Sequence, residues 1–176
     1  MHDGRLRPIE AADIASIGTI YREAVLTGTA SFELDPPDDQ EMTRRMRDLL
    51  AGGFPFVVAE DEPGTVLGYA YAGPYRARPA YRFTVENSVY LAAGARGRGI
   101  GTALLERLIG DCEAIGCRQM VAIIGDSANH ASISLHRRCG FRHTGTLQAV
   151  GWKHGRWLDS VIMQRALGEG AGAAPT

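Results

Sequence analysis

The sequence predicts a mixed α/β fold, in which one sheet carries helices on both of its faces. Strand-like and helix-like runs are interspersed in the order β-α-α-β-β-β-α-β-α-β-β, which favours one mixed sheet over separate all-α and all-β units. A length of 176 residues suits one domain with its own core, and neither a repeat nor an interior linker divides it. We therefore expect a single domain over residues 1–167, followed by a flexible tail of small residues at 168–176.

The first elements are a short strand and two helices. Leu6–Ile9 can form the strand, and Asp13 is placed to cap the helix that follows it. Apolar residues recur in that helix at helical spacing, namely Ile14, Ile17, Tyr21, Ala24 and Val25. A second helix is expected to begin near Asp38 or Asp39, after two prolines. Its buried face is predicted to consist of Met42, Met46, Leu49 and Leu50.

Three strands are expected next. Residues 56–59 and 65–72 flank the turn Asp61–Gly64 and should pair as a hairpin. A long strand, Tyr81–Leu91, follows an irregular polar loop at 73–79. Alternation gives this strand two faces, with Phe83, Val85, Asn87, Val89 and Leu91 on one and Thr84, Glu86, Ser88 and Tyr90 on the other.

The last third of the chain alternates helices and strands. After a glycine-rich loop, a helix is expected to end at Gly116 and to bury Ala103, Leu104, Leu108, Cys112 and Ile115. A short buried strand, a helix stopped by Gly140 and two final strands should follow, at 120–124, 129–138, 141–147 and 157–163.

Charge and composition exclude several classes of function. The formal net charge is −1, so no global basic field attracts nucleic acid or an anionic membrane. No apolar run approaches the roughly 20 residues that a membrane span needs, and the start lacks the apolar segment of a signal peptide. The cysteines Cys112, Cys117 and Cys139 are odd in number, which is typical of reduced thiols in a cytoplasm. They match no common zinc pattern, so we expect no metal.

The loop Arg96-Gly97-Arg98-Gly99-Ile100-Gly101 has the chemistry of a phosphate cradle. Its glycines let the backbone approach a ligand and expose successive N–H groups. The following helix adds partial positive charge, and the two arginines add full charges. A nucleotide-binding P-loop would need a lysine before Thr102, and a dinucleotide fingerprint would need other glycine spacing and an acidic residue about 20 positions on. The remaining alternative is a flexible turn with two solvated arginines.

These residues resemble the GNAT superfamily of N-acetyltransferases. That superfamily carries Gln/Arg-x-x-Gly-x-Gly/Ala after its fourth strand, which Arg96–Gly101 satisfies, and it often has Leu-Gly-Phe where this chain has Cys139-Gly140-Phe141. The segments 75–81, 84–90, 121–125 and 151–159 further resemble the phosphinothricin/methionine sulfoximine N-acetyltransferase branch. The resemblance covers about residues 5 to 167. It implies a mostly antiparallel sheet of about seven strands, flanked by four helices and split between the cofactor strand and the next.

The resemblance implies that acetyl-CoA is the acetyl donor. Its pyrophosphate would lie on residues 97–102, including Thr102, beside Arg96 and Arg98. Its pantetheine arm would pair with the backbone of Val89, Tyr90 and Leu91 like an added strand. Asn129 can give a further side-chain hydrogen bond, cap its helix, or do both.

Direct transfer to an amine also needs a general base that deprotonates the amine and a proton for the CoA thiolate that leaves. Glu86 is the candidate general base, and its alternative is an exposed glutamate paired with Arg82. Many superfamily members have a tyrosine general acid where this chain has His136, so that role does not carry over directly. His136 can supply a proton, orient the substrate or make a core contact, and the sequence leaves these open. The family implies a backbone N–H near Tyr90 or Leu91 as the oxyanion donor.

The acceptor amine is expected to carry a carboxylate. Arg76 and Arg78 lie on the loop before the Glu86 strand, and arginine matches carboxylate oxygens with paired donors. The remaining residues assigned to the substrate are Ala77, Tyr81, Thr84, Glu86 and Lys153. Lys153 and Trp157 can instead belong to a dimer interface, and aromatics such as Phe32, Tyr75 and Tyr81 can be pocket walls or plain core.

The sequence therefore predicts an N-acetyltransferase acting on L-phosphinothricin, L-methionine sulfoximine, methionine sulfone or a similar amino acid. Alternatives within the fold are acetylation of a protein N-terminus, a polyamine or another metabolite amine. A different class, a non-catalytic acyl-CoA sensor, would keep the glycine-rich loop but need no base. The family also implies a homodimer, and we expect neither nucleic acid nor membrane as a partner.

Overall fold

The computed structural model of the protein describes residues 4–61 and 64–175. Over this part of the chain it contains one seven-stranded sheet in the order β1-β2-β3-β4-β5-β7-β6. The strands are β1 (Arg5–Pro8), β2 (Phe56–Glu60), β3 (Val66–Pro74), β4 (Thr84–Leu91), β5 (Gln119–Gly125), β6 (Arg142–Lys153) and β7 (Arg156–Ala166). The helices are α1 (Ile14–Thr27), α2 (Asp39–Ala51), α3 (Ile100–Ala114) and α4 (His130–Arg138), with three short 3-10 turns. The predicted fold class and order of elements are confirmed.

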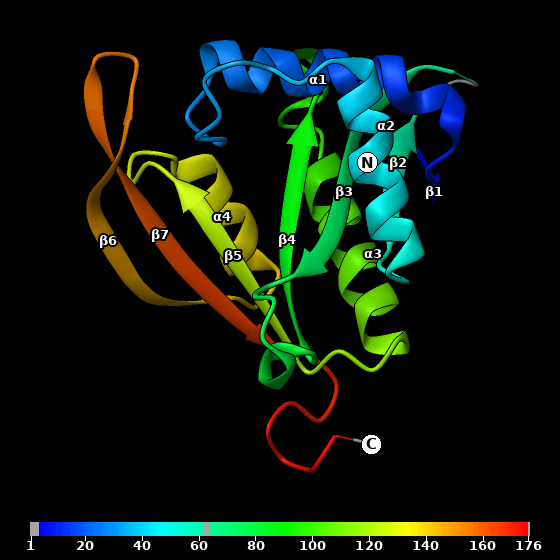
Figure 1. Ribbon diagram of the computed structural model, residues 1–176, viewed down its shortest axis with the longest axis vertical. Helices are drawn as coiled ribbons and strands as arrows, with labels where there is room; N and C mark the ends of the chain where they lie inside the picture. The colour runs from blue at the N-terminus through cyan, green and yellow to red at the C-terminus, as the bar shows by residue number, and fades with distance from the viewer. Residues whose placement is uncertain (1–3, 62–63, 176) are drawn as a thin grey trace.

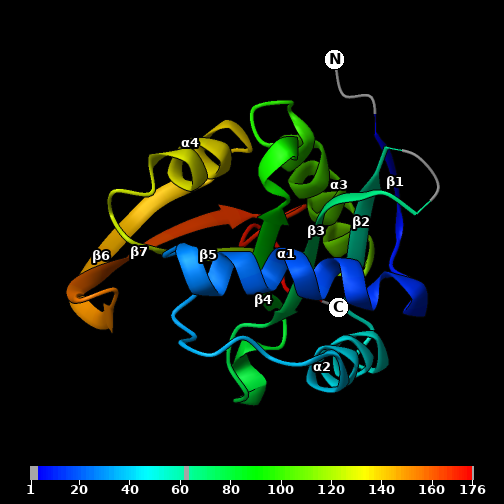
Figure 2. The same ribbon diagram turned by 90° about the horizontal axis from the view of Figure 1, so that it is seen from above.

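The helices cover both faces of the sheet (Figure 2), as α1 and α2 lie on one side and α3 and α4 on the other. Each face has its own buried cluster, because strands with apolar residues on both sides need cover on both sides. Leu104, Leu105 and Leu108 of α3 are fully buried on one face, and Ile17 and Val25 of α1 are fully buried on the other. The sheet therefore stands as the middle of three layers.

The sheet opens between β4 and β5 (Figure 1). These neighbours run parallel, whereas the other strand pairs of the described residues are antiparallel. Their register covers only Thr84 to Glu86, opposite residues 119–121, and the remaining length of β4 pairs with β3 alone. The predicted split beside the cofactor strand is thus confirmed, and it leaves one edge of β4 without a partner strand.

Two predicted element starts are corrected. The strand predicted from Tyr81 begins at Thr84, because residues 79–81 form a 3-10 turn and the Tyr75 amide donates to the Thr84 carbonyl at 3.2 Å. Asp13 does not cap α1 with its side chain. Its carboxylate instead accepts from the Glu10 amide at 2.8 Å and from Arg7 at 2.7 Å, which closes a 3-10 turn before the helix.

Helix α2 begins as predicted, since the Asp38 side chain accepts a hydrogen bond from the Glu41 amide at 2.8 Å.

Two predicted core positions are wrong: Leu50 is 44% exposed and Ile115 is 50% exposed. Leu50 lies in the last turn of α2, and Ile115 is the residue that follows the end of α3. The hairpin of β2 and β3 is confirmed, although Glu62 and Pro63 of its predicted turn lie outside the described residues.

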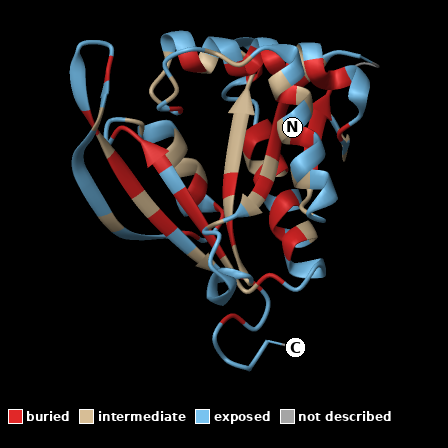
Figure 3. Cartoon of the chain, in the orientation of Figure 1, coloured by how far each residue is buried: buried red, intermediate tan, exposed pale blue. Residues whose placement is uncertain are grey.

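The last two strands are longer than predicted, running over 142–153 and 156–166 rather than 141–147 and 157–163. They pair antiparallel out to Lys153 and Arg156, with irregular register between Leu147 and Gly151. Figure 3 shows β6 exposed along most of its length, because it is the edge strand and no helix covers its outer part. Such a strand has little hydrophobic alternation, which is why its pattern ended early in the sequence.

Candidate functional site

A cleft of about 310 Å³ lies where β4 and β5 separate. Its walls come from β4 and β5, from the segment between α1 and α2, and from the start of α4. The residues that matter below are Ser31, Phe32, Glu86, Gly125, Asn129 and His136. These residues come from four separate stretches of the chain, and Tyr71 of β3 and Ser160 of β7 also line the cleft.

Glu86 lies at the point where the pairing of β4 and β5 ends. Burial raises the pKa of its carboxyl group, and the positive charge of Arg76 opposes this with a smaller effect. Arg82, its alternative partner, instead stacks on Phe83 with its guanidinium carbon 4.4 Å from the ring centroid. A carboxylate with a raised pKa, facing a cleft, is suited to accepting a proton near neutral pH.

The free edge of β4 runs upward from Glu86. Residues 87–91 have no parallel partner on β5, so their outward N–H and C=O groups can pair with an extended, amide-bearing ligand. Val89 and Tyr90 line the cleft, and the backbone of Leu91 continues the same edge. This geometry fits the predicted strand-like pairing of a pantetheine arm.

The glycine-rich loop lies between β4 and α3. Gly97 and Gly99 have φ angles of 75° and 83°, a region that side chains with a Cβ rarely adopt, and a Cβ on either would meet no atom within 4 Å. The first α3 backbone bond runs from the Ala103 amide to the Gly99 carbonyl, so the amides of Ile100, Gly101 and Thr102 point out of the helix end. Free amides at a helix start are suited to binding an anion, as the predicted phosphate cradle requires.

The other residues of the loop divide between packing and charge. The Ile100 side chain is buried in the core, and a Cβ on Gly101 would lie 3.4 Å from Leu135 and from Leu91. These two residues therefore present only backbone to a ligand. Arg96 and Arg98 are exposed, and each guanidinium has a carboxylate nearby: Glu23 at 3.5 Å and Asp61 at 3.3 Å respectively.

Asn129 and His136 both line the cleft from the α4 side. The Asn129 Oδ1 accepts from the Ser132 amide at 3.2 Å and caps α4, which leaves its amide nitrogen available as a donor. His136 is 4% exposed, with Nδ1 2.8 Å from the Ser132 carbonyl and Nε2 2.9 Å from Asn87 Oδ1. Burial lowers its pKa, with a smaller opposite effect from the bond to Ser132. Because both ring nitrogens contact protein atoms, the geometry favours the core-contact role.

The residues predicted from the 76–84 segment are only partly brought together. Arg76 lies 4.9 Å from the Tyr75 ring centroid and is near enough to lower the Glu86 pKa. Ala77, Arg78, Tyr81 and Thr84 lie outside the lining of the cleft. Tyr81 packs edge-on against Tyr75 at 5.6 Å.

Lys153 does not line the cleft either. It is 4% exposed, and its ammonium donates to the Ser31 carbonyl at 2.7 Å. Burial lowers the pKa of this lysine, while the negative charge of Glu33 opposes that effect. Lys153 thus holds the segment between α1 and α2 against the end of the β6–β7 hairpin.

Phe32 lines the cleft, which is one of the two alternatives that the sequence left open for it, whereas Ala30, Ser31, Asn87 and Ser132 were missed by reasoning from the sequence. A polar loop between two helices has no periodicity, and only the hydroxyl of Tyr21 on an otherwise apolar helix face hinted at a polar contact there.

Within residues 4–61 and 64–175, no group of three or more His, Cys, Asp or Glu side chains is arranged to hold a metal ion. The helices of the same residues are all too short or too polar to cross a membrane.

Comparison with known proteins places this geometry among acetyltransferases. Residues 19–141 match the profile of the acetyltransferase (GNAT) family. The chain is 51% identical to a phosphinothricin N-acetyltransferase of Alcaligenes faecalis, over 97% of this chain and 86% of the relative. It is 43% identical to an L-methionine sulfoximine/L-methionine sulfone acetyltransferase of Pseudomonas aeruginosa, over 90% and 92%. A phosphinothricin acetyltransferase of Sinorhizobium meliloti, solved with acetyl-CoA, superposes with a TM-score of 0.96 at 53% identity, over 99% of this chain and 94% of the other.

Proposed function

The chain belongs to the acetyltransferase (GNAT) family and is an acetyl-CoA-dependent N-acetyltransferase. From this premise we propose that its acceptor is a small amino acid of the phosphinothricin or methionine sulfoximine type. We also propose that Glu86 is the general base. The observation that carries the proposal is the place of Glu86. This half-buried carboxyl group, with a raised pKa, lies in the cleft at the point where the free edge of β4 begins.

Acetyl-CoA supplies an acetyl thioester, and the chain holds it at two places. The amides at the start of α3 and the two arginines of the loop suit its phosphates. The outward groups of β4 at 87–91 suit the amides of its arm. The free edge of β4 leads into the cleft that contains Glu86, so an arm paired with that edge would bring the thioester beside this carboxyl group.

Glu86 takes a proton from the acceptor ammonium, which frees the nitrogen lone pair for attack. Across the described residues no side chain donates a hydrogen bond to this carboxylate, so its oxygens are available to the ammonium. Arg76, whose positive charge acts on the Glu86 carboxyl group, suits the acceptor carboxylate, with Arg78 further along the loop. Phe32 forms part of another wall of the cleft.

A thiol-release assay with purified protein tests this function. We expect turnover with L-phosphinothricin, L-methionine sulfoximine and methionine sulfone, and little with polyamines or peptide N-termini. Acetyl-CoA binding without turnover on any amine would instead favour a non-catalytic acyl-CoA sensor.

Removing the positive charge of Arg76 should change both acceptor binding and pH dependence. In Arg76→Ala the Glu86 pKa rises further, because a charge that favours the carboxylate is gone. The base is active when deprotonated, so the acid limb of the kcat/KM profile should move to higher pH, and the acceptor KM should rise. Arg78→Ala is the matched control: we expect a higher acceptor KM without a shift of the limb. Profiles that coincide for Arg76→Ala and the parent enzyme would contradict the role of Arg76.

Neutralising the two carboxylates beside the glycine-rich loop should tighten acetyl-CoA binding. Glu23 is paired with Arg96, and Asp61 is paired with Arg98. A bound pyrophosphate competes with these carboxylates for the two guanidinium groups. Each exposed pair of this kind contributes about 0.2–1 kcal/mol, so Glu23→Gln with Asp61→Asn should lower the acetyl-CoA Kd about two- to thirtyfold at low salt. The gain should disappear at high salt, and Asp48→Asn, which breaks a surface pair on α2, should show none. Calorimetric titration measures all three, and an unchanged Kd in the double variant would refute the competition.

The homodimer remains part of the proposal. Leu147, Val150, Trp152 and Trp157 of the β6–β7 hairpin are each more than half exposed, and the two tryptophan rings meet edge-on at 5.2 Å. An apolar group of this size on an uncovered hairpin supports a protein contact there. Light scattering of the purified protein measures its mass and so tests the dimer.

A cytoplasmic location stays a prediction from the three free cysteines.

A further inference from the structure

The segment between α1 and α2, residues 28–38, forms one wall of the cleft that contains Glu86, and it has no helix or strand. Its contribution to the lining is Ala30, Ser31 and Phe32. A loop without backbone pairing keeps its place only through the side chains that hold it, so the contacts of this segment decide the shape of the cleft.

One end of the segment is attached to β5 and β6. Lys153 holds the Ser31 carbonyl, and the ring of Phe32 lies against the backbone of Gly151, where an added Cβ would be 2.5 Å from the ring. An added Cβ on Gly125 would likewise lie 2.8 Å from the same ring and would overlap the Thr29 carbonyl. This end is fixed by close packing.

The other end is held by hydrogen bonds alone. The Tyr21 hydroxyl donates to Glu33 Oε1 at 3.1 Å and lies 3.0 Å from the Ser31 hydroxyl. The Glu33 amide in turn donates to the Ser31 hydroxyl at 3.2 Å. Ser31 therefore takes its position from Glu33 as well as from Lys153.

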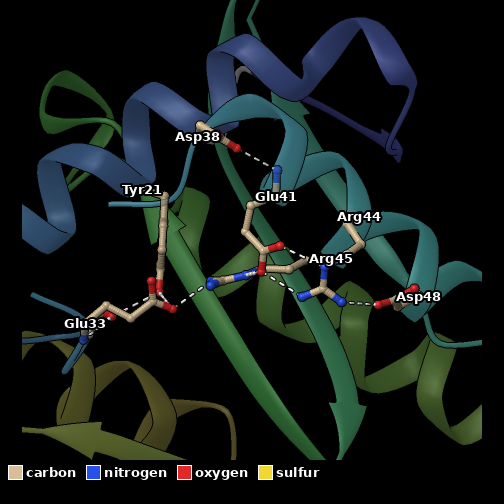
Figure 4. Close-up of polar contacts among 8 residues, drawn as sticks. Tyr21, Glu33, Asp38, Glu41, Arg44, Arg45 and Asp48 are labelled. Atoms are coloured by element: carbon tan, nitrogen blue, oxygen red, sulfur yellow. Dashed lines mark hydrogen bonds and ion pairs between the residues drawn. The ribbon is translucent and has the colours of Figure 1, made fainter. Parts of the chain in front are cut away.

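Glu33 is itself held from α2 (Figure 4). Arg45 reaches across from the helix and donates to Glu33 Oε1 at 2.6 Å, while its Nε donates to Glu41 at 2.8 Å. The neighbouring Arg44 contacts the same Glu41 and also Asp48, but it does not contact Glu33. Of these two adjacent arginines, only Arg45 connects the helix to the wall of the cleft.

A second cavity of about 270 Å³ lies beside this connection. Tyr21, Arg45 and Tyr71 are among the residues that line this cavity, and Tyr71 also lines the cleft. Open space next to Tyr21 and Arg45 leaves these side chains room to move when their hydrogen bonds to Glu33 are lost, since few atoms would clash.

We propose that Arg45 and Glu33 are positioning residues that hold the 28–38 segment against the cleft and thereby set how tightly the acceptor amino acid binds. The proposal rests on the proposed function, because it assigns the acceptor to this cleft. Neither residue touches the reacting atoms. Their effect passes through Tyr21 and Ser31 to Phe32, which forms the wall that faces the acceptor.

The test compares Arg45→Met with Arg44→Met, which removes an equal charge from the same helix. We expect Arg45→Met to raise the acceptor KM about tenfold, because small displacements of a positioned wall are costly, and to leave the acetyl-CoA KM and kcat within about twofold. Arg44→Met should leave all three at the parent values. Arg45→Lys keeps a positive charge and should recover part of the loss, and Glu33→Gln with Arg45→Met should be no worse than the single change.

Hydrogen exchange gives a second readout that does not depend on activity. The amides of residues 31–34 should exchange faster in Arg45→Met than in Arg44→Met and the parent protein. Equal exchange in the three proteins would overturn the proposal. So would an acceptor KM of Arg45→Met equal to that of a parent protein that turns over normally. A parent protein that turns over no amino acid, yet shows the difference in exchange, would instead refute the acceptor assignment and leave the connection between α2 and the loop standing.

Discussion

Replacing Glu86 with glutamine is expected to lower kcat by about 10²–10⁴, because a positioned base contributes that much to proton removal. Glutamine keeps the size of the side chain and its place at the foot of the β4 edge, but it cannot accept the ammonium proton. The acetyl-CoA Kd should stay within about twofold, because the phosphate and arm contacts lie elsewhere, at the start of α3 and along residues 87–91. Steady-state thiol release and calorimetric titration measure the two quantities.

The controls separate the base from a change in local charge. Glu86→Asp keeps the carboxylate on a shorter stem and should lose less kcat than Glu86→Gln. The acid limb that the raised pKa gives to the parent profile should disappear in Glu86→Gln, since the group that titrates is gone. Normal turnover by Glu86→Gln would show that another group, or water, removes the proton.

The second large effect is expected from Gly125→Ala. The new Cβ would overlap the carbonyl oxygen of Thr29 and lie 2.8 Å from Phe32 Cε1. The first clash is with backbone, which cannot rotate away, so the 28–38 segment must move. Overpacking of this kind costs about 1–3 kcal/mol of stability, and the displaced wall should raise the acceptor KM at least about tenfold. Thermal unfolding and acceptor kinetics measure both consequences.

Two other glycines serve as controls. Gly110 lies inside α3, where an added Cβ meets no atom within 4 Å, so Gly110→Ala should stabilise the protein by about 0.5–1 kcal/mol with unchanged kinetics. In Gly151→Ala the three atoms nearest to the new Cβ all belong to the ring of Phe32, a side chain that can turn. That variant should alter the acceptor KM with little loss of stability. If Gly125→Ala bound the acceptor as well as the parent does, the close approach at Thr29 would not shape the cleft.

Local sequence patterns were sufficient for most elements of the fold. Helices α1 and α3 were predicted because their apolar residues recur at helical spacing, and α2 because Asp38 is a good cap. The pattern failed at element ends, where no periodic run remains. Tyr81 was placed in a strand although a 3-10 turn precedes β4, and β6 was ended early because an exposed edge strand lacks hydrophobic alternation.

The candidate site divides in the same way. The cradle at 96–102 and the cap at Asn129 depend on glycine conformation, helix ends and neighbouring side chains, so they were visible in short stretches of sequence. The sequence shows that residue 136 is a histidine but not what its ring contacts. Its Nδ1 contacts the nearby Ser132 carbonyl, whereas its Nε2 contacts Asn87, which lies 49 positions away.

The sequence by itself therefore determined the order of elements, a glycine-rich loop at the start of a helix and Glu86 as a carboxylate on a polar strand face. The tertiary structure decided what surrounds these groups. Burial and a nearby Arg76 set the pKa of Glu86, and the separation of β4 from β5 opens the cleft. Lys153 donates a hydrogen bond to the Ser31 carbonyl, 122 positions away in the sequence. Arg45 of α2 donates a hydrogen bond to Glu33. The physical reason is that helix spacing and glycine angles act between near neighbours in the chain, whereas desolvation, ion pairing and cavity shape depend on residues that only folding brings together.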